Sequence, residues 1–168
     1  SIRPTSDRTR ESIFNILHSI FHRFTDKRVL DLYAGTGALG IEALSRGAVK
    51  ATFVEQAKAA RAALKNNISI IATAAACEIM STAVSEAIPV LQEKKEQFDL
   101  IFMDPPYGKN LVHKTLERLA ATDLCAPAVI VVCEYFIRDT VNEHYGPLSC
   151  FDTRRYGQTL VSFFTVTG

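Results

Sequence analysis

The sequence lacks several features that would place it in a specialised class. No apolar run reaches the roughly eighteen residues that a membrane-spanning helix needs, no secretory signal is visible, and no internal repeat occurs. The four cysteines form no C-x-x-C pair, and neither they nor the four histidines show metal-ligand spacing. We therefore expect reduced thiols in a cytoplasmic protein, no metal centre, and one globular domain for 168 residues of which 48% are hydrophobic.

A strong net charge is also lacking: the formal value is +1, which by itself indicates no nucleic-acid partner. The distribution is less even, because residues 1–28 hold six Arg or Lys against three Asp or Glu. A phosphate-facing surface and a solvated helix face both explain this excess. Arg154 and Arg155 leave the same two interpretations open, contact with phosphate or an exposed strand face.

Short apolar runs alternate with longer amphipathic segments along most of the chain. The expected strands span residues 28–33, 51–55, 77–81, 98–103, 128–134, 149–156 and 160–166. The expected helices span residues 7–21, 38–46, 56–71, 84–96, 110–121 and 136–143. This alternation predicts an α/β fold: a mostly parallel sheet of seven strands with helices on both faces, and an antiparallel C-terminal hairpin that turns at Gly157. Ligands of such sheets bind beyond the carboxyl ends of the strands.

A glycine-rich turn, Gly35-Thr36-Gly37-Ala38-Leu39-Gly40, follows the first expected strand. Glycine lets the backbone turn sharply and approach a ligand closely. Glu55 ends the next strand, 20 residues after Gly35, where a carboxylate can accept hydrogen bonds from both hydroxyls of a ribose. The pattern predicts a ligand that contains adenosine, and both a nicotinamide dinucleotide and S-adenosylmethionine fit it.

Asp31, which lies just before the turn, favours one of these two ligands. A carboxylate there can bind the ammonium group of a methionine moiety, whereas a pyrophosphate prefers amide donors and no nearby anion. The residues therefore favour S-adenosylmethionine. Gly40 needs no ligand, because close packing between helix and strand explains a glycine at that position.

The sequence Asp104-Pro105-Pro106-Tyr107 directly follows the apolar run 98–103. The Asp104 carboxylate and the Pro105 carbonyl can both accept hydrogen bonds from one exocyclic amine, which exposes the lone pair of its nitrogen. The prolines fix φ at about −65° and stiffen the loop, and Tyr107 can stack on the base that carries the amine. This turn favours methyl transfer to a base nitrogen; a helix N-cap at Asp104 and a strand terminator at the prolines are the structural alternatives.

Three blocks occur in the order found in the RsmD family, which the chain resembles over essentially its whole length. They are Arg3-Pro4-Thr5-Ser6-Asp7-Arg8-Thr9-Arg10-Glu11, the stretch LDLYAGTGALGIEALSRG at residues 30–47, and Asp104-Pro105-Pro106-Tyr107. Members of this family are bacterial methyltransferases that act on the N2 amine of a guanine in small-subunit (16S) ribosomal RNA. The first two blocks are the more specific, because adenine-N6 enzymes share the third.

The resemblance implies a Rossmann-like class I methyltransferase fold. Residues 28–168 would form the methyltransferase domain, and residues 1–27 an N-terminal helix and a segment at the RNA and cofactor entrance. The implied cofactor contacts are Asp31, Tyr33, Gly35, Gly37, Glu55, Thr82 and Ala83, with Thr82 standing where relatives often have Asp or Asn. The implied catalytic residues are Asp104, Pro105, Pro106 and Tyr107, and the implied RNA contacts are Arg3, Arg8 and Arg10.

The expected protein is therefore a cytoplasmic, monomeric methyltransferase that uses S-adenosylmethionine and involves no membrane and no metal. Its expected partner is 16S rRNA, either naked or within a small ribosomal subunit or assembly particle. Three alternatives stay open: an adenine-N6 nucleic-acid methyltransferase, a nicotinamide-dependent oxidoreductase with the same glycine turn, and a non-catalytic RNA-binding or assembly module.

Overall fold

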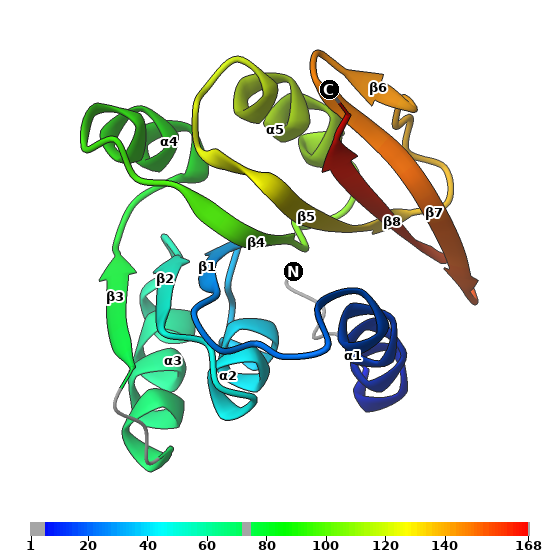
Figure 1. Ribbon diagram of the computed structural model, residues 1–168. Helices are drawn as coiled ribbons and strands as arrows, with labels where there is room; N and C mark the ends of the chain where they lie inside the picture. Colours follow the sequence, from blue (N-terminus) through cyan, green and yellow to red (C-terminus); the bar gives the residue numbers. More distant parts are fainter. Residues whose placement is uncertain (1–5, 72–74, 168) are drawn as a thin grey trace.

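The computed structural model describes residues 6–71 and 75–167, which fold around one eight-stranded sheet (Figure 1). Its strands are β1 (Arg28–Leu32), β2 (Lys50–Val54), β3 (Ala76–Met80), β4 (Phe98–Met103), β5 (Cys125–Phe136), β6 (His144–Tyr145), β7 (Leu148–Tyr156) and β8 (Thr159–Val166). They lie in the order β3-β2-β1-β4-β5-β8-β7-β6. Neighbours from β3 to β5 run parallel and those from β5 to β6 antiparallel, which confirms the predicted α/β sheet with an antiparallel C-terminal hairpin.

Helices cover both faces of this sheet. They are α1 (Asp7–Phe21), α2 (Ala38–Ser45), α3 (Lys58–Ile70), α4 (Val84–Glu93) and α5 (Leu111–Ala120). The first three lie on one face and the last two on the other (Figure 1). Side chains of β4 alternate between the two resulting cores: Leu100 and Phe102 join the core under α1, and Ile101 and Met103 the core under α5. Burial on both faces explains why this strand is a continuous apolar run.

The first helix has the bounds that the sequence predicts, Asp7–Phe21. Ser6 is its N-cap, because its Oγ accepts a hydrogen bond from the Thr9 amide at 3.1 Å. The Phe14 ring lies 5.7 Å from the Phe102 ring of β4, measured between centroids. The helix is thus anchored in the same core as the parallel strands.

The position of β1 defines where the sheet changes direction. The chain runs from β1 outward to β2 and β3 on one side, and to β4 and β5 on the other. At such a switch point the loops that follow the neighbouring strands diverge and leave a crevice beyond their carboxyl ends. The glycine turn, Glu55 and Asp104 follow β1, β2 and β4 respectively, so all three reach this crevice.

Two expectations were wrong. The sheet has eight strands instead of seven, because β6 pairs with the start of β7. The helix expected at residues 136–143 does not form: the Ile137 amide donates to the Gln158 carbonyl at 2.8 Å, and the Asn142 amide to the Tyr145 hydroxyl at 2.8 Å. Gln158 lies in the β7–β8 turn and Tyr145 lies in β6, so these partners replace the bonds that a helix would need.

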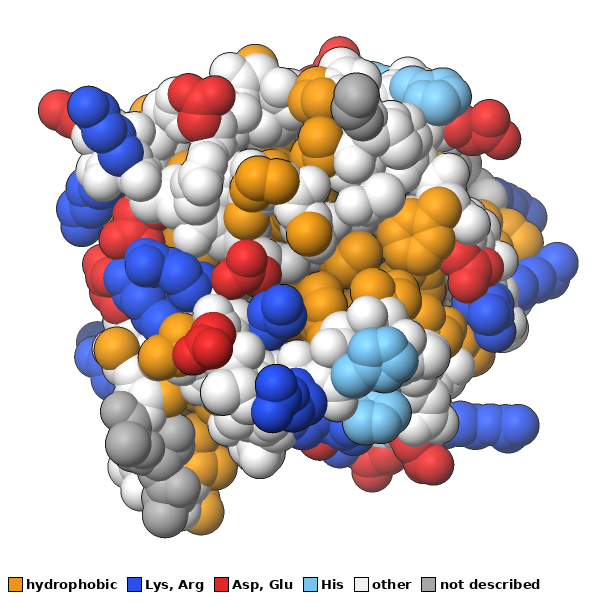
Figure 2. Space-filling view, in the orientation of Figure 1, with side chains coloured by type: hydrophobic (Ala, Val, Ile, Leu, Met, Phe, Trp, Pro, Cys, Tyr) orange, Lys and Arg blue, Asp and Glu red, His pale blue; other side chains and the backbone are white. Residues whose placement is uncertain are grey.

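None of the helices within residues 6–71 and 75–167 is both long and apolar enough to cross a membrane. On the face drawn in Figure 2, hydrophobic side chains gather over the C-terminal strands, and basic and acidic side chains are interspersed over the rest. This face therefore carries no single dominant charge, in keeping with the net value of +1.

Candidate active site

The glycine turn connects β1 to α2 through a series of left-handed residues. Tyr33, Gly35 and Gly37 have φ values of 58°, 59° and 87°. A Cβ on Gly37 would lie 2.3 Å from the Leu64 Cδ1, so this position excludes every larger residue unless the buried leucine moves. For Tyr33 the left-handed conformation costs about 1–2 kcal/mol, and such strain is typical of functional sites.

Glu55 holds this turn in place. Its Oε1 accepts a hydrogen bond from the Gly35 amide at 2.8 Å, and its Oε2 accepts one from the Ala57 amide at 2.9 Å. The side chain is only 6% exposed. A carboxylate has about four lone-pair sites, so two remain for the ribose hydroxyls that the sequence analysis assigns to it.

Asp31 is buried beneath the start of α2. Its Oδ2 accepts a hydrogen bond from the Gly40 amide at 3.0 Å. Burial raises the pKa of Asp31 to about 8, the Gly40 amide opposes this rise, and the negative charge of Glu55 adds to it. A Cβ on Gly40 would lie 2.4 Å from the Phe53 ring, which confirms that close packing explains this glycine.

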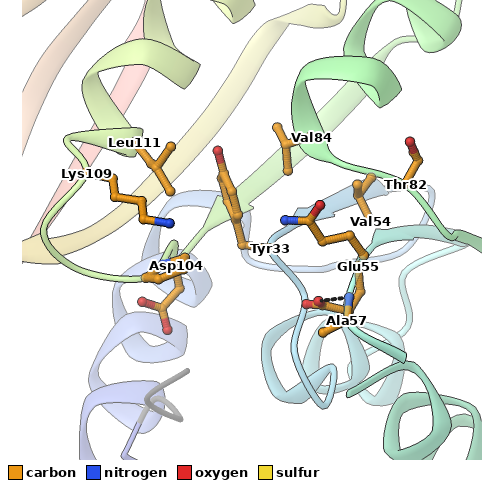
Figure 3. Close-up of a pocket in the computed structure, with 11 residues that line it drawn as sticks. Tyr33, Val54, Glu55, Ala57, Thr82, Val84, Asp104, Lys109 and Leu111 are labelled. Atoms are coloured by element: carbon orange, nitrogen blue, oxygen red, sulfur yellow. Dashed lines mark hydrogen bonds between the residues drawn. The ribbon is translucent and has the colours of Figure 1, made fainter. Parts of the chain in front are cut away.

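A cavity of about 240 Å³ lies at the carboxyl ends of β1, β2 and β4. It is lined by Tyr33, Val54, Glu55, Gln56, Ala57, Thr82, Val84, Asp104, Pro106, Lys109 and Leu111. Figure 3 shows the Tyr33 ring between Asp104 and Lys109 on one side and Val84 and Glu55 on the other. Apolar walls with a few polar groups at one end suit a flat heterocycle attached to a sugar.

The implied cofactor contacts occupy different places around this cavity. Tyr33, Glu55 and Thr82 line it. The Tyr33 hydroxyl is held by Thr115 Oγ1 at 2.7 Å, and the Thr82 hydroxyl donates to Glu86 Oε2 at 2.8 Å. The four others, Asp31, Gly35, Gly37 and Ala83, shape or flank the cavity without lining it.

The Asp-Pro-Pro-Tyr turn extends from the end of β4 to the rim of the cavity. Asp104 and Pro106 line the cavity, and Pro105 is buried. The N-cap of the next helix is Asn110, six residues after Asp104, so Asp104 does not cap that helix. The prolines do follow a strand end, and the same turn therefore both terminates β4 and presents Asp104 to the cavity.

Tyr107 is fastened to the C-terminal hairpin. Its hydroxyl lies 2.8 Å from Thr159 Oγ1 at the start of β8, and its ring centroid lies 5.2 Å from that of Phe136 at the end of β5. The Tyr107 side chain is 36% exposed. The two rings form an aromatic surface beside Asp104, on the side of the turn that faces the hairpin.

The three arginines implied as RNA contacts differ in their surroundings. Arg3 lies outside the described residues. Arg10 pairs with Asp7 at 3.0 Å and with Glu42 at 3.8 Å. Arg8 is exposed and lines a second cleft between the start of α1 and the β7–β8 turn.

Sequence reasoning missed Lys109, Thr115 and Thr159. Lys109 lines the cavity, and the two threonines fix Tyr33 and Tyr107. Only Lys109 had a local signal, because it follows the Asp-Pro-Pro-Tyr block by two residues. The threonines are distant in sequence from the tyrosines they contact, so no local pattern could have identified them.

Two features of the site disfavour a nicotinamide dinucleotide. The Gly35 amide, which a pyrophosphate would need, donates to Glu55, and Asp31 places a second carboxylate below the turn. The sheet also differs from the dinucleotide-binding type, because antiparallel β8 lies next to β5 where a sixth parallel strand would stand. Within the described part of the chain, no group of three or more His, Cys, Asp or Glu side chains is arranged to hold a metal ion.

Comparison with known proteins agrees with this geometry. The family model described as "Conserved hypothetical protein 95" matches residues 1–165. "Ribosomal RNA small subunit methyltransferase D" of Escherichia coli (strain K12) is 35% identical over 133 residues, which are 79% of this chain and 64% of the relative. "Putative rRNA methyltransferase YlbH" of Bacillus subtilis (strain 168) is 30% identical over 168 residues, 100% of this chain and 90% of the relative.

A solved structure shows the same fold. "Putative methyltransferase yhhF from Escherichia coli" superimposes with a TM-score of 0.81 at 26% identity and covers 98% of this chain and 88% of its own. The match to the Escherichia coli relative spans less than two thirds of that relative's length, whereas the family model matches nearly the whole of this chain. The fold is therefore that of the α/β methyltransferases, and the chain belongs to the RsmD family.

Proposed function

We propose that this protein transfers a methyl group from S-adenosylmethionine to the exocyclic N2 amine of a guanine in 16S rRNA, acting in the cytoplasm as a monomer. The observation that carries the proposal is the shared cavity of Glu55 and Asp104. The first is the acid at the end of β2, suited to a ribose, and the second heads the turn suited to an amine. Relatives named as small-subunit rRNA methyltransferases support RNA as the substrate.

The residues of the cavity fit this cofactor. Glu55 offers acceptors for ribose hydroxyls, and Val54, Val84 and Leu111 offer apolar contact to an adenine ring. Thr82 lines the same cavity, where its oxygen can accept from the adenine amine and the neighbouring Ala83 amide can bind the ring. Asp31, buried beneath the turn, offers its carboxyl group to the methionine ammonium group, whose positive charge would favour the ionised form that burial disfavours.

When bound, S-adenosylmethionine supplies an electrophilic methyl group on a sulfonium sulfur. The protein's task is to prepare the nucleophile, whose nitrogen lone pair is delocalised into the purine ring. Asp104 and the Pro105 carbonyl accept hydrogen bonds from the two N–H groups of the amine and favour a pyramidal nitrogen, and Asp104 would take up the proton that the amine loses when it gains the methyl group. Because the prolines fix the turn, these acceptors need no reorganisation, and the Asp104 carboxylate stabilises the positive charge that develops on nitrogen.

The aromatic surface of Tyr107 and Phe136 suits the base itself. A base that reaches Asp104 must leave its stack, and stacking on an aromatic ring compensates for the contacts it loses. The Thr159 contact holds the Tyr107 ring in one orientation. A guanine stacked there would lie beside the turn that carries Asp104.

The test is product analysis. The protein is incubated with labelled S-adenosylmethionine and, in parallel, with a 16S rRNA transcript and with small ribosomal subunits from cells that lack the activity. Digestion to nucleosides should yield N2-methylguanosine. Formation of N6-methyladenosine would instead identify the adenine-N6 alternative, and binding of RNA without any methyl transfer would identify the non-catalytic module.

A further inference from the structure

A second cleft of about 590 Å³ lies beside the Asp-Pro-Pro-Tyr turn. One wall comes from the start of α1 and contains Ser6, Arg8 and Thr9, and the other comes from the β7–β8 turn and contains Arg155, Tyr156 and Thr159. These walls are about 150 residues apart in the chain. Neither the cofactor cavity nor the proposed chemistry uses this cleft.

The second cleft joins the proposed active site through one contact. Thr159, which lines the cleft, holds the Tyr107 hydroxyl at 2.8 Å. Asp104 and Pro106, in the same turn as Tyr107, line the cofactor cavity. The Asp-Pro-Pro-Tyr turn therefore connects the cofactor cavity to the second cleft. A nucleotide whose base stacks on Tyr107 would extend its sugar and phosphates toward this cleft.

Two arginines give the cleft its charge. Among the described residues, Arg8 and Arg155 form no ion pair with an acidic side chain, whereas their neighbours Arg10 and Arg154 pair with Asp7 and Asp152. Arg155 Nε donates to the Gly157 carbonyl at 2.8 Å, which occupies one of its five N–H groups and orients the rest. Basic side chains are visible around the end of the β7–β8 hairpin (Figure 2).

The two walls are held together by a hydrogen bond. Ser12 Oγ pairs with the Tyr156 hydroxyl. Ser12 lies one helical turn after Arg8 on α1, and Tyr156 directly follows Arg155 on β7. The elements that carry the two arginines are therefore joined by a direct contact, which favours a preorganised cleft.

We propose that this cleft binds the RNA backbone next to the target nucleotide, with Arg8 and Arg155 contacting phosphates from opposite walls. The proposal rests on the proposed function and adds to it where the substrate lies. Guanidinium groups bind phosphate oxygens through paired hydrogen bonds, and among the described residues no acidic side chain compensates the charges of Arg8 and Arg155. The contact also fixes the RNA register, because phosphate contacts position a nucleic acid without reading its sequence.

The experiment compares R8Q and R155Q with R154Q, whose arginine neighbours Arg155 on the same strand but pairs with Asp152. Binding of a fluorescein-labelled 16S rRNA transcript is titrated at several salt concentrations. For R8Q and for R155Q, the slope of log K against log salt should flatten by about 0.7–0.9, as expected for one lost phosphate contact. R154Q should keep the wild-type slope, and all three should bind S-adenosylhomocysteine as the wild type does.

The kinetic readout separates this inference from the proposed function. In R8Q and R155Q, the KM for RNA should rise roughly 5- to 10-fold while kcat at saturating RNA changes little, because the lost contact acts on RNA binding. If both variants keep the wild-type salt slope while the wild type transfers methyl groups, RNA binding at the second cleft is contradicted and the proposed function is unaffected. A wild-type protein that binds the cofactor analogue but neither binds nor methylates 16S rRNA would overturn both.

Discussion

The Glu55 carboxylate accepts a hydrogen bond from the Gly35 amide at 2.8 Å, across 20 residues of sequence. The acid at the end of β2 therefore holds the turn that follows β1. Because its other oxygen binds the Ala57 amide, Glu55 also fixes its own loop. One buried side chain thus shapes two walls of the cofactor cavity before any ligand arrives.

Replacement of Glu55 by alanine should weaken binding of S-adenosylmethionine by roughly 1–3 kcal/mol, since charge-assisted hydrogen bonds to the ribose are lost. It should also lower the thermal midpoint of unfolding, because the Gly35 and Ala57 amides lose their acceptor. Calorimetric titration and thermal unfolding measure the two effects on the same sample. Wild-type protein should show no binding of NAD in the same titration, and tight binding would contradict the cofactor assignment.

Asp31 should make stability depend on pH in a definite direction. Its pKa is about 8 in the folded protein, against an ordinary value of 3.8. Between these values the unfolded chain has lost the proton and the folded chain retains it. The stability contribution of Asp31 therefore falls as pH rises from about 4 to about 8, at up to about 1.4 kcal/mol per pH unit.

The variant D31N lacks this titration and should grow more stable relative to the wild type between pH 5 and pH 8. Urea unfolding at both values measures the difference. D31N should at the same time bind S-adenosylmethionine more weakly, because an amide does not attract the methionine ammonium group. If the difference in unfolding free energy between D31N and the wild type is the same at pH 5 and pH 8, Asp31 ionises freely in the folded state.

Asp104 should be essential for methyl transfer. In D104N an amide donor replaces one acceptor oxygen, and single-turnover methylation should fall by about two to three powers of ten. Cofactor affinity should change little, since Asp104 acts on the base. Asn110, not Asp104, caps α5, so loss of a helix cap does not account for such a fall. Near-normal turnover by D104N would show that the Asp104 carboxylate has only a structural role.

The variant G37A should destabilise the fold more than G157A does. Both glycines have a positive φ, 87° and 62°, so each substitution costs about 1 kcal/mol in backbone strain. Only at Gly37 would the new methyl group also meet a buried side chain, Leu64, at 2.3 Å. Denaturant unfolding should therefore show a difference of about 1–3 kcal/mol between the two variants. Equal effects would mean that Leu64 moves aside freely.

Local sequence determined most of the helices and strands and the turns that follow them. Apolar periodicity and a cap at Ser6 or Asp7 predict α1, the structure selects Ser6 as that cap, and the run before Asp104 predicts β4 to the residue. Glycine at position 37 and proline at 105 and 106 act through their own backbone restrictions, which need no distant partner. For this reason the glycine turn and the Asp-Pro-Pro-Tyr turn could both be predicted before the fold was known.

Only the tertiary structure decided which side chains connect these turns and strands to one another. The contact of Glu55 with Gly35 exists because β1 and β2 are neighbours, and that of Tyr107 with Thr159 because β8 inserts beside β5. The same insertion places the Gln158 carbonyl where it accepts from the Ile137 amide, and residues 137–143 form a loop from β5 to β6 instead of a helix. Each of these bonds joins groups far apart in sequence, and their partners are chosen by strand order and core packing, which no local pattern of residues encodes.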